Sequence, residues 1–382
     1  MSASHTSAPF SRAVVRAMRK LYPPALADNS WDNTGLLLEA PFAPSRRQSN
    51  TVLLTIDLTK AVAEEAIALK CSIVVAYHPI IFKGLKALTL ANTQQQTLLR
   101  LASHGISVYS PHTAVDAAPG GLGDWLADIV TGTKTTKHEL ELSTSSTSQD
   151  ALSDTRDDDP FVEKQRPTYT LNHHPSQTAL RLSKDSSSTT SSVPHTRRPV
   201  VPQSPEIASH PGAGMGRVVQ FNTPQPLATL LDRIGKGMNN PKGFPIAIPQ
   251  DKAISDISIQ SVGICAGSGA SLLGGLDVDL LFTGEMSHHE ALAAIEKGQV
   301  VISLFHSNSE RGFLAEVLRG QLEDAIETEW SNLRDGEMEA SDNGEGPEED
   351  LMSALQDEDF EVIVSEVDRD PYGIVVLKGE TK

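Results

Sequence analysis

Short apolar runs alternate with helical repeats over residues 51–130. The strand candidates are continuous apolar runs at residues 51–56, 72–76 and 106–109. The helix candidates carry apolar positions at helical spacing at residues 60–69, 94–102 and 122–129. Strands that alternate with helices in this way are typical of an α/β domain, whose largely parallel sheet is covered on both faces.

The same alternation returns after residue 212. The strand candidates here are residues 216–221, 258–265, 278–282, 300–305 and 361–367. The helix candidates are residues 226–234, 288–296 and 309–320. The pattern therefore predicts two similar α/β lobes with mixed, largely parallel sheets.

Two segments lack this alternation. Residues 131–211 are rich in Ser, Thr, Pro, Asp and Gln and keep no apolar period, so we expect a long disordered insert. Between residues 333 and 359, eleven acids stand against one base, and we expect a flexible acidic segment. The predicted division is a first lobe at 1–130, the insert at 131–211, a second lobe at 212–332, the acidic segment at 333–359 and a closing strand within 360–382.

The N-terminal region allows two interpretations. Its first 27 residues hold four bases and no acid, a composition typical of a mitochondrial transit peptide. However, apolar residues recur at helical spacing from Phe10 to Leu21, and we favour an amphipathic first helix. The expected compartment is the cytoplasm, with the mitochondrion as an alternative.

Composition excludes several classes of protein. The chain of 382 residues has no apolar run near the roughly 20 residues that span a membrane. Its formal charge of −17 argues against sequence-independent nucleic-acid binding, because such binding needs clustered Lys and Arg side chains. Cys71 and Cys265 are the only cysteines, which rules out a disulfide framework and a Cys-rich zinc module.

Histidines follow the predicted strands, where the carboxyl ends of an open α/β sheet form ligand sites. These histidines are His78, His112, His288, His289 and His306. Asp116, Glu285 and Glu310 lie near them in the sequence, and Asp57 directly follows the strand predicted at residues 51–56. Imidazole with carboxylate suits Zn, Mn, Fe, Co or Ni, and a carboxylate that bridges two ions supports hydrolysis.

Each of these residues also has a purely structural interpretation. His306 and Glu310 are four residues apart, which places them on one helix face, yet Glu310 could instead complete a helix cap. Asp57 could orient a metal ligand or simply end a strand. The glycine-rich residues 263–269 (GICAGSG) match neither a P-loop nor a dinucleotide motif, which leaves a tight turn that allows close packing, or an anion-binding nest.

Several strings together resemble the NIF-three family (Ngg-interacting factor three), which is related to YbgI and includes proteins named GTP cyclohydrolase I type 2. The matching strings are SWDNTGLLLE (30–39), AYHPIIF (76–82), SPHTAVDAAPGGLGDWLA (110–127), TGEMSHHEAL (283–292), HSNSERGFL (306–314) and VIVSEVDRDP (362–371). They are most similar to the eukaryotic branch.

The resemblance implies a dinuclear metal centre in a cleft between the lobes and a homo-oligomer, either a dimer or a hexameric ring. The metal ligands it implies are His78, Asp116, His306 and Glu310. Tyr77 stands where bacterial relatives have a second histidine, so the number of ions, one or two, is open. His289 and His288 would line the cleft and carry protons or bind substrate.

The expected function is that of a divalent-metal-binding protein, a metal-dependent hydrolase acting on a small molecule that bears a phosphate or an amide. A cyclohydrolase acting on GTP has weak support, because no base-binding carboxylate can be recognised. The alternative is a protein-interaction module that acts as the partner of a transcriptional adaptor without catalysis. That role would add the nucleus to the candidate compartments.

Overall fold

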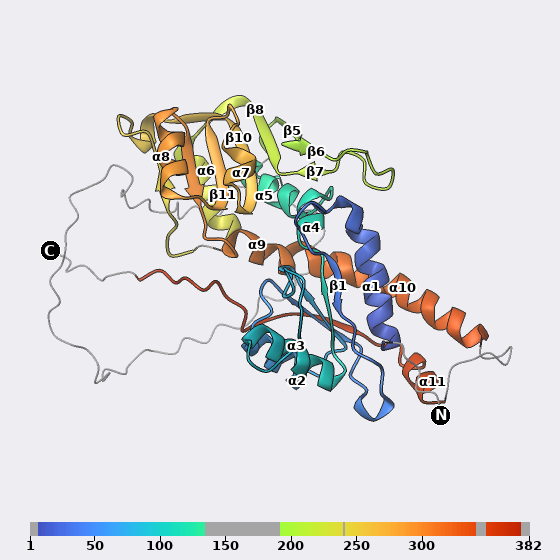
Figure 1. The fold of residues 1–382 in the computed structure, drawn as a ribbon. Coiled ribbons are helices and arrows are strands. Elements are labelled where there is room, and N and C mark those ends of the chain that lie inside the picture. The colour runs from blue at the N-terminus through green and yellow to red at the C-terminus, as the bar shows by residue number, and fades with distance from the viewer. Residues whose placement is uncertain (1–6, 134–191, 240, 341–348, 376–382) are drawn as a thin grey trace, which may run out of the picture.

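Two β-sheets, each covered by helices, make up the fold (Figure 1). The computed structural model describes residues 7–133, 192–239, 241–340 and 349–375. Both sheets have parallel strands at their centre and antiparallel strands at an edge, which confirms the predicted mixed α/β class with two largely parallel sheets.

The first sheet has the strand order β1-β4-β3-β2-β13. Its parallel strands are β4 (Ser107–Ser110), β3 (Ile73–Ala76), β2 (Thr51–Thr55) and β13 (Glu361–Val364). The edge strand β1 (Gly35–Leu38) runs antiparallel to β4. The last strand among the described residues therefore returns to the first sheet and pairs with β2.

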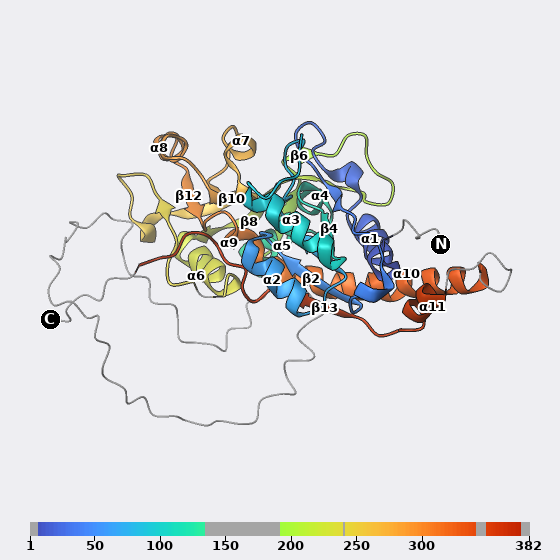
Figure 2. The ribbon, with the colours of Figure 1, turned by 60° about the horizontal axis from the view of Figure 1, so that its bottom comes forward.

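Helices cover both faces of the first sheet. Leu53, Val74 and Val108 pack under α2 (Lys60–Ala68) and α3 (Thr93–His104), which come forward in Figure 2. The other face meets α1 (Pro9–Leu21) and α10 (Arg319–Ala340), which lie side by side. Burial on two faces explains why these strands read as unbroken apolar runs.

The first helix has a structural role. Phe10, Val14 and Met18 are at most 1% exposed, and the Phe10 ring meets Trp330 of α10 edge-on at 5.6 Å between centroids. This confirms the amphipathic interpretation of the N-terminal pattern. Among the described helices, none has the length and apolar character needed to cross a bilayer.

The second sheet has the strand order β5-β8-β10-β11-β12-β9. Its strands are β5 (His195–Arg198), β8 (Arg217–Pro226), β10 (Ser258–Ser268), β11 (Leu280–Glu285), β12 (Val300–Ser303) and β9 (Ile246–Ala247). The central strands β10, β11 and β12 are parallel. α5 (Leu122–Thr131) and α6 (Leu227–Gly237) pack on one face, and α7 (Ala270–Leu273) and α8 (His288–Glu296) pack on the other.

Shorter elements connect these layers. They are η1 (Pro24–Leu26), η2 (Pro44–Arg46), α4 (Thr113–Ala117), β6 (Val201–Pro202), β7 (Gly214–Met215), η4 (Ile254–Asp256), α9 (Asn308–Phe313), the π-helical turn η5 (Leu314–Leu318) and α11 (Glu349–Leu355). The strands β6 and β7 form a small antiparallel pair of their own.

The predicted disordered insert extends too far toward the C-terminus. His195–Arg198 forms β5, which pairs with β8 at the edge of the second sheet, and β6 follows. An edge strand needs few apolar residues, because its backbone hydrogen bonds and one half-buried face hold it in place. Composition alone therefore missed this strand. Residues 134–191 of the expected insert lie outside the described residues.

The acidic segment also contains helical structure. α10 continues to Ala340, and Glu349–Leu355 forms α11. Leu333 and Leu355 are 2% and 0% exposed, and Arg334 Nε donates to the Leu355 carbonyl at 2.7 Å. Apolar residues spaced among the acids thus form a buried face, which corrects the expectation of a flexible segment for the described part. Residues 341–348 lie outside it.

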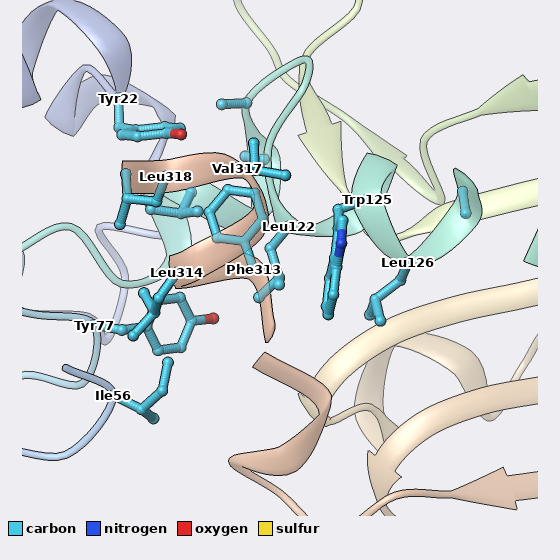
Figure 3. Packing of buried hydrophobic residues seen from close by; sticks show 14 of the residues in the cluster. Tyr22, Ile56, Tyr77, Leu122, Trp125, Leu126, Phe313, Leu314, Val317 and Leu318 are labelled. Carbon is cyan, nitrogen blue, oxygen red and sulfur yellow. The ribbon is translucent and has the colours of Figure 1, made fainter. Parts of the chain in front are cut away.

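One cluster of buried side chains extends from the first sheet to the second. Figure 3 shows its centre, where Phe313 and Leu314 lie between Tyr77 on one side and Trp125 of α5 on the other. The Trp125 and Phe313 ring centroids are 6.1 Å apart. The helical segment α9–η5–α10 is therefore the packing element shared by both sheets.

A buried ion pair fixes α5 against the second sheet. Arg217 of β8 is 2% exposed, and its Nε and Nη2 donate to the two carboxylate oxygens of Asp124 at 2.7 and 2.9 Å. Its remaining donors bind backbone carbonyls, including that of Gly214. Burial alone would raise the pKa of Asp124. The hydrogen bonds and positive charge of Arg217 have the larger effect, so the pKa lies below its ordinary value.

We predict that Asp124→Asn lowers the free energy of unfolding by about 3–5 kcal/mol at pH 7, because it leaves the buried Arg217 charge uncompensated. The pKa of Asp124 is lower in the folded state than in the unfolded state, where it is near 4. The stability that the ion pair contributes is therefore complete above about pH 4 and is lost as the pH falls through the folded-state pKa. The difference between wild type and variant should therefore narrow below about pH 4. Urea unfolding followed by circular dichroism at pH 7 and pH 3 measures both effects.

Glu64→Gln is the matched control, since Glu64 pairs with Arg100 at an exposed site and should contribute about 1 kcal/mol or less. Equal stability of Asp124→Asn and Glu64→Gln at pH 7 would contradict the assigned role of the buried pair.

Candidate metal centre

Two histidines meet where strands of the two sheets end. His78 lies two residues after the end of β3, and His306 lies three residues after the end of β12. Their ring centroids are 5.1 Å apart. Ligand atoms of His78, His306 and Glu310 all lie within 4.8 Å of one another, a spacing that one ion can bridge.

Glu310 occupies the position between the two imidazoles. Its Oε2 is 3.5 Å from His78 Nε2, and its Oε1 is 3.6 Å from His306 Nε2. Both distances exceed those of ordinary hydrogen bonds. The residue is 2% exposed, and its Oε2 has no hydrogen-bond partner among the described residues. A buried carboxylate without a partner is costly, and a cation in this position would compensate it.

The far nitrogen of each imidazole binds another carboxylate. His78 Nδ1 is 3.0 Å from Asp57 Oδ1, and His306 Nδ1 is 2.9 Å from Glu285 Oε1. Histidines that bind metals usually donate their second nitrogen in this way, which leaves the first as a ligand. Of the two interpretations open for Asp57, orientation of a ligand is the one that the geometry supports.

The donor set fits a divalent cation. Burial alone would lower the pKa of His78, but the hydrogen bond to Asp57 and the negative charges of Glu310 and Asp57 raise it to about 10. In the absence of an ion, a proton on His78 thus offsets the negative charge around it. Ligands must be deprotonated to bind a metal, so binding here releases that proton.

Asp116, the fourth predicted ligand, lies on the wall of the same cavity but outside the three-residue cluster. The hydroxyl of Tyr77 donates to its Oδ1 at 2.7 Å. Burial raises the pKa of Asp116 to about 6 and holds that of Tyr77 well above its ordinary value. Tyr77 therefore keeps its proton and occupies one of the two carboxylate oxygens of Asp116.

Backbone geometry at the site is unusual. Phe305, directly before His306, has φ +69°, and His112 has φ +35°. Such values are uncommon for residues with a side chain and tend to occur at functional sites. The π-helical turn η5 follows α9, which carries Glu310, and such turns are frequent near ligand sites.

The glycine-rich end of β10 packs directly against the candidate ligands. Gly267 has φ +57°, and a Cβ added there would lie 2.8 Å from Glu310 Oε1 and 3.0 Å from His306 Nε2. Its N–H donates to Ser309 Oγ at 2.8 Å. Residues 263–268 belong to β10, so the expected tight turn is absent, whereas the expected close packing is observed at Gly267.

The segment after β13 connects the two halves of the site. Asp368 Oδ2 accepts from the backbone N–H of Ile56 at 2.7 Å and forms an ion pair with Arg311 Nη1. Asp370 Oδ2 accepts from the N–H and the hydroxyl of Ser307, at 3.2 and 2.8 Å. These carboxylates tie the end of β2 to the start of the helix that carries Glu310. Sequence reasoning missed this connection, although the residues lie in the quoted VIVSEVDRDP string.

The clustered residues line a cavity of about 640 Å³ between the sheets. His112 also lines it, and its Nδ1 is 2.6 Å from Asp32 Oδ1. The predicted cleft residues His288 and His289 do not line it. Both are exposed in the first turn of α8 and contact each other, so their role in proton transfer stays a prediction.

Comparison with known proteins shows the family of this chain. Residues 11–335 match the profile of the Duf34/NIF3 (NGG1p interacting factor 3) family. The chain belongs to the DUF34/NIF3 family. The Protein NIF3 homolog of Schizosaccharomyces pombe is 38% identical over 85% of this chain and 93% of its own length. NGG1-interacting factor 3 of Saccharomyces cerevisiae is 35% identical over 81% of this chain and 90% of its own length.

The fold of this DUF34/NIF3 protein also matches solved structures. A Bacillus cereus protein related to NIF3 superposes with a TM-score of 0.54 at 18% identity, covering 95% of this chain and 98% of that one. At such low identity the likeness concerns the fold alone.

We predict that Asp57→Asn weakens zinc binding about 10- to 100-fold, because the amide no longer fixes the His78 ring with its Nε2 free. Competition against a zinc-chelating dye at pH 7.5 measures the affinity. Asp256→Asn, an exposed carboxylate in η4, is the control and should bind as wild type does. Unchanged affinity in Asp57→Asn would contradict the role assigned to Asp57.

We further predict that Gly267→Ala weakens zinc binding at least about tenfold, since the added methyl group displaces His306 or Glu310. Gly212→Ala is the matched control, because Gly212 has φ +76° and open space around it. Both variants should lose about 1 kcal/mol of stability from the left-handed backbone. Only the first should lose the metal, as measured by the same dye competition together with urea unfolding.

Proposed function

We propose that this protein binds a divalent cation through His78, His306 and Glu310 and uses it to hydrolyse a small molecule that bears a phosphate or an amide. The observation that carries the proposal is the buried Glu310 carboxylate, whose oxygens each face an imidazole nitrogen beyond hydrogen-bond distance. A bound cation would supply Lewis acidity toward a phosphoryl or carbonyl group. Zn, Mn, Fe, Co and Ni all suit these donors.

The protein's own side chains would hold the cation and leave room for the substrate beside it. Asp57 and Glu285 keep both Nε2 atoms directed at Glu310, and the cavity admits a small molecule beside them. We assign Asp116 to a second, weaker ion site, because its Oδ1 accepts the Tyr77 hydrogen bond, which leaves the other carboxylate oxygen for an ion.

Metal analysis of matched variants tests the proposal. Stripped wild-type protein, reloaded with zinc and desalted, should retain about one ion per chain by mass spectrometry, and Glu310→Gln should retain at least about 100-fold less at limiting zinc. The exposed Glu327→Gln should behave as wild type does. Wild type that stays metal-free after reloading would contradict the proposal.

Hydrolysis is tested separately on chromogenic phosphate esters and anilides. We expect turnover by the loaded wild type and loss of turnover in Glu310→Gln. Metal retention without turnover of any of these probes would contradict the hydrolase and leave the metal site in place.

A second candidate function is binding to a transcriptional adaptor. The Saccharomyces cerevisiae relative is named as a factor that interacts with NGG1, and exposed acids in the 333–359 segment could contact a basic partner. Neutralising Asp335 and Asp359 together should weaken binding to purified yeast NGG1 protein, whereas Glu310→Gln should not. Loss of binding in Glu310→Gln, with unchanged binding in the acidic double variant, would contradict a metal-independent adaptor role.

Assembly into a dimer or hexamer belongs to the same proposal. Leu85, Leu88 and Leu90 form an exposed apolar stretch after β3, at 44%, 52% and 71% exposure, which is suited to contact another copy of the chain. Sedimentation equilibrium distinguishes these assemblies from a monomer.

A further inference from the structure

Two large aromatic rings are exposed at the candidate metal cavity. Trp31 and Phe82 both line it and are 50% and 46% exposed, whereas Trp125 and Trp330 are each 2% exposed. The Trp31 and Phe82 centroids are 5.8 Å apart with the planes tilted by 45°. Leaving such rings in water forgoes the free energy of burying them, so their exposure beside a cavity points to a ligand.

Hydrogen bonds hold the Trp31 ring in place. Its Nε1 donates to Asp28 Oδ2 at 2.9 Å, and the Asp28 N–H donates to Thr113 Oγ1 at 3.0 Å. Asn33 lies two residues further along the same loop, and its side-chain amide donates to the carbonyl of Ile81, the residue before Phe82. The loop that carries one ring is thus tied to the segment that carries the other, so the pair is arranged before any ligand arrives.

A chain of ring contacts joins this pair to the metal ligands. Trp31 meets His112 edge-on at 5.7 Å, and His112 lies 5.5 Å from His78, measured between centroids. Two ring contacts therefore separate the aromatic pair from the nearest proposed ligand. A molecule that reaches both needs only a short connection between its ring and its metal-directed group.

The charges of the cavity limit which metal-directed group a ligand can carry. Among the described residues that line it, the ionisable side chains are Asp28, Asp116, Glu310, Tyr77, Cys265 and histidines, with neither Lys nor Arg. Lys60 and Arg369 line a separate cavity that shares His78. A polyphosphate in the metal cavity would therefore lack a cationic side chain, whereas a single phosphate or amide needs only the metal.

We propose that Trp31 and Phe82 form a platform for the planar aromatic ring of the substrate, whose reacting group is one phosphate or amide rather than a polyphosphate. The part of this inference that brings the reacting group to the metal rests on the proposed function. The platform itself rests on the two exposed rings, their fixed loop and the shared cavity. Aromatic rings prefer offset or edge-to-face contacts with a ring partner, which gives selectivity over a saturated ring of similar size.

A matched pair of probes tests the platform on the full zinc-loaded chain. Phenyl phosphate should bind about five- to tenfold more tightly than cyclohexyl phosphate by isothermal titration calorimetry. It should also quench tryptophan fluorescence, because Trp31 is the exposed tryptophan. Trp31→Ala and Phe82→Ala should each reduce this preference while cyclohexyl phosphate binds as before, and Trp31→Phe should partly restore it. Leu69→Ala, 39% exposed and outside the cavity lining, is the control.

Three results would overturn the inference. They are equal affinity for the two probes, a preference that survives both alanine variants, and tighter binding of adenosine triphosphate than of adenosine monophosphate that is lost in Lys60→Ala or Arg369→Ala. Metal content is measured in the same samples. Retained zinc without a ring preference contradicts the platform alone, whereas a ring preference in protein that holds no zinc supports the platform and contradicts the proposed function.

Discussion

A buried carboxylate placed between two imidazoles is the constraint on which the rest of the structure depends. Glu310 is almost fully covered, and each of its oxygens faces an imidazole from a different sheet. Such a charge must be compensated, by a proton on His78 or by a cation shared among the three side chains. The requirement links the electrostatics of the core directly to the chemistry available at the cavity.

The fold brings these groups together because the carboxyl ends of parallel strands from both sheets face the same cavity. Parallel strands of each sheet end at the cavity, so residues after β3 and β12 meet there although they are far apart in the sequence. The shared helical segment α9–η5–α10 carries Glu310 and packs against both sheets (Figure 3). Asp368 and Asp370 then connect the end of β2 to the start of that segment.

Local pattern was sufficient to predict most of the strands and the histidines that follow them. It could not show that Glu285 orients His306, or that Tyr77 binds Asp116, because both contacts depend on how distant segments pack. The predicted proton carriers His288 and His289 follow a strand as His306 does, yet the turn that begins α8 directs them to the surface. Strand position thus indicates the correct edge of a sheet, but the loop geometry decides which side chains reach the cavity.

Composition was the weaker guide. It assigned disorder to residues that form β5 and flexibility to residues of α10 and α11, because an edge strand and an acidic helix need only a few buried positions each. Conversely, the exposed Trp31 carries information that composition hides, since one ring left in water beside a cavity matters more than the low aromatic content of the chain.

The most direct test of this account is anomalous diffraction from crystals of the zinc-loaded protein, with data collected on both sides of the zinc edge. The account predicts a strong peak about 2.0–2.2 Å from Nε2 of His78, Nε2 of His306 and an oxygen of Glu310. A peak elsewhere, with both Nε2 atoms unligated and Glu310 hydrogen-bonded to the protein, would contradict it.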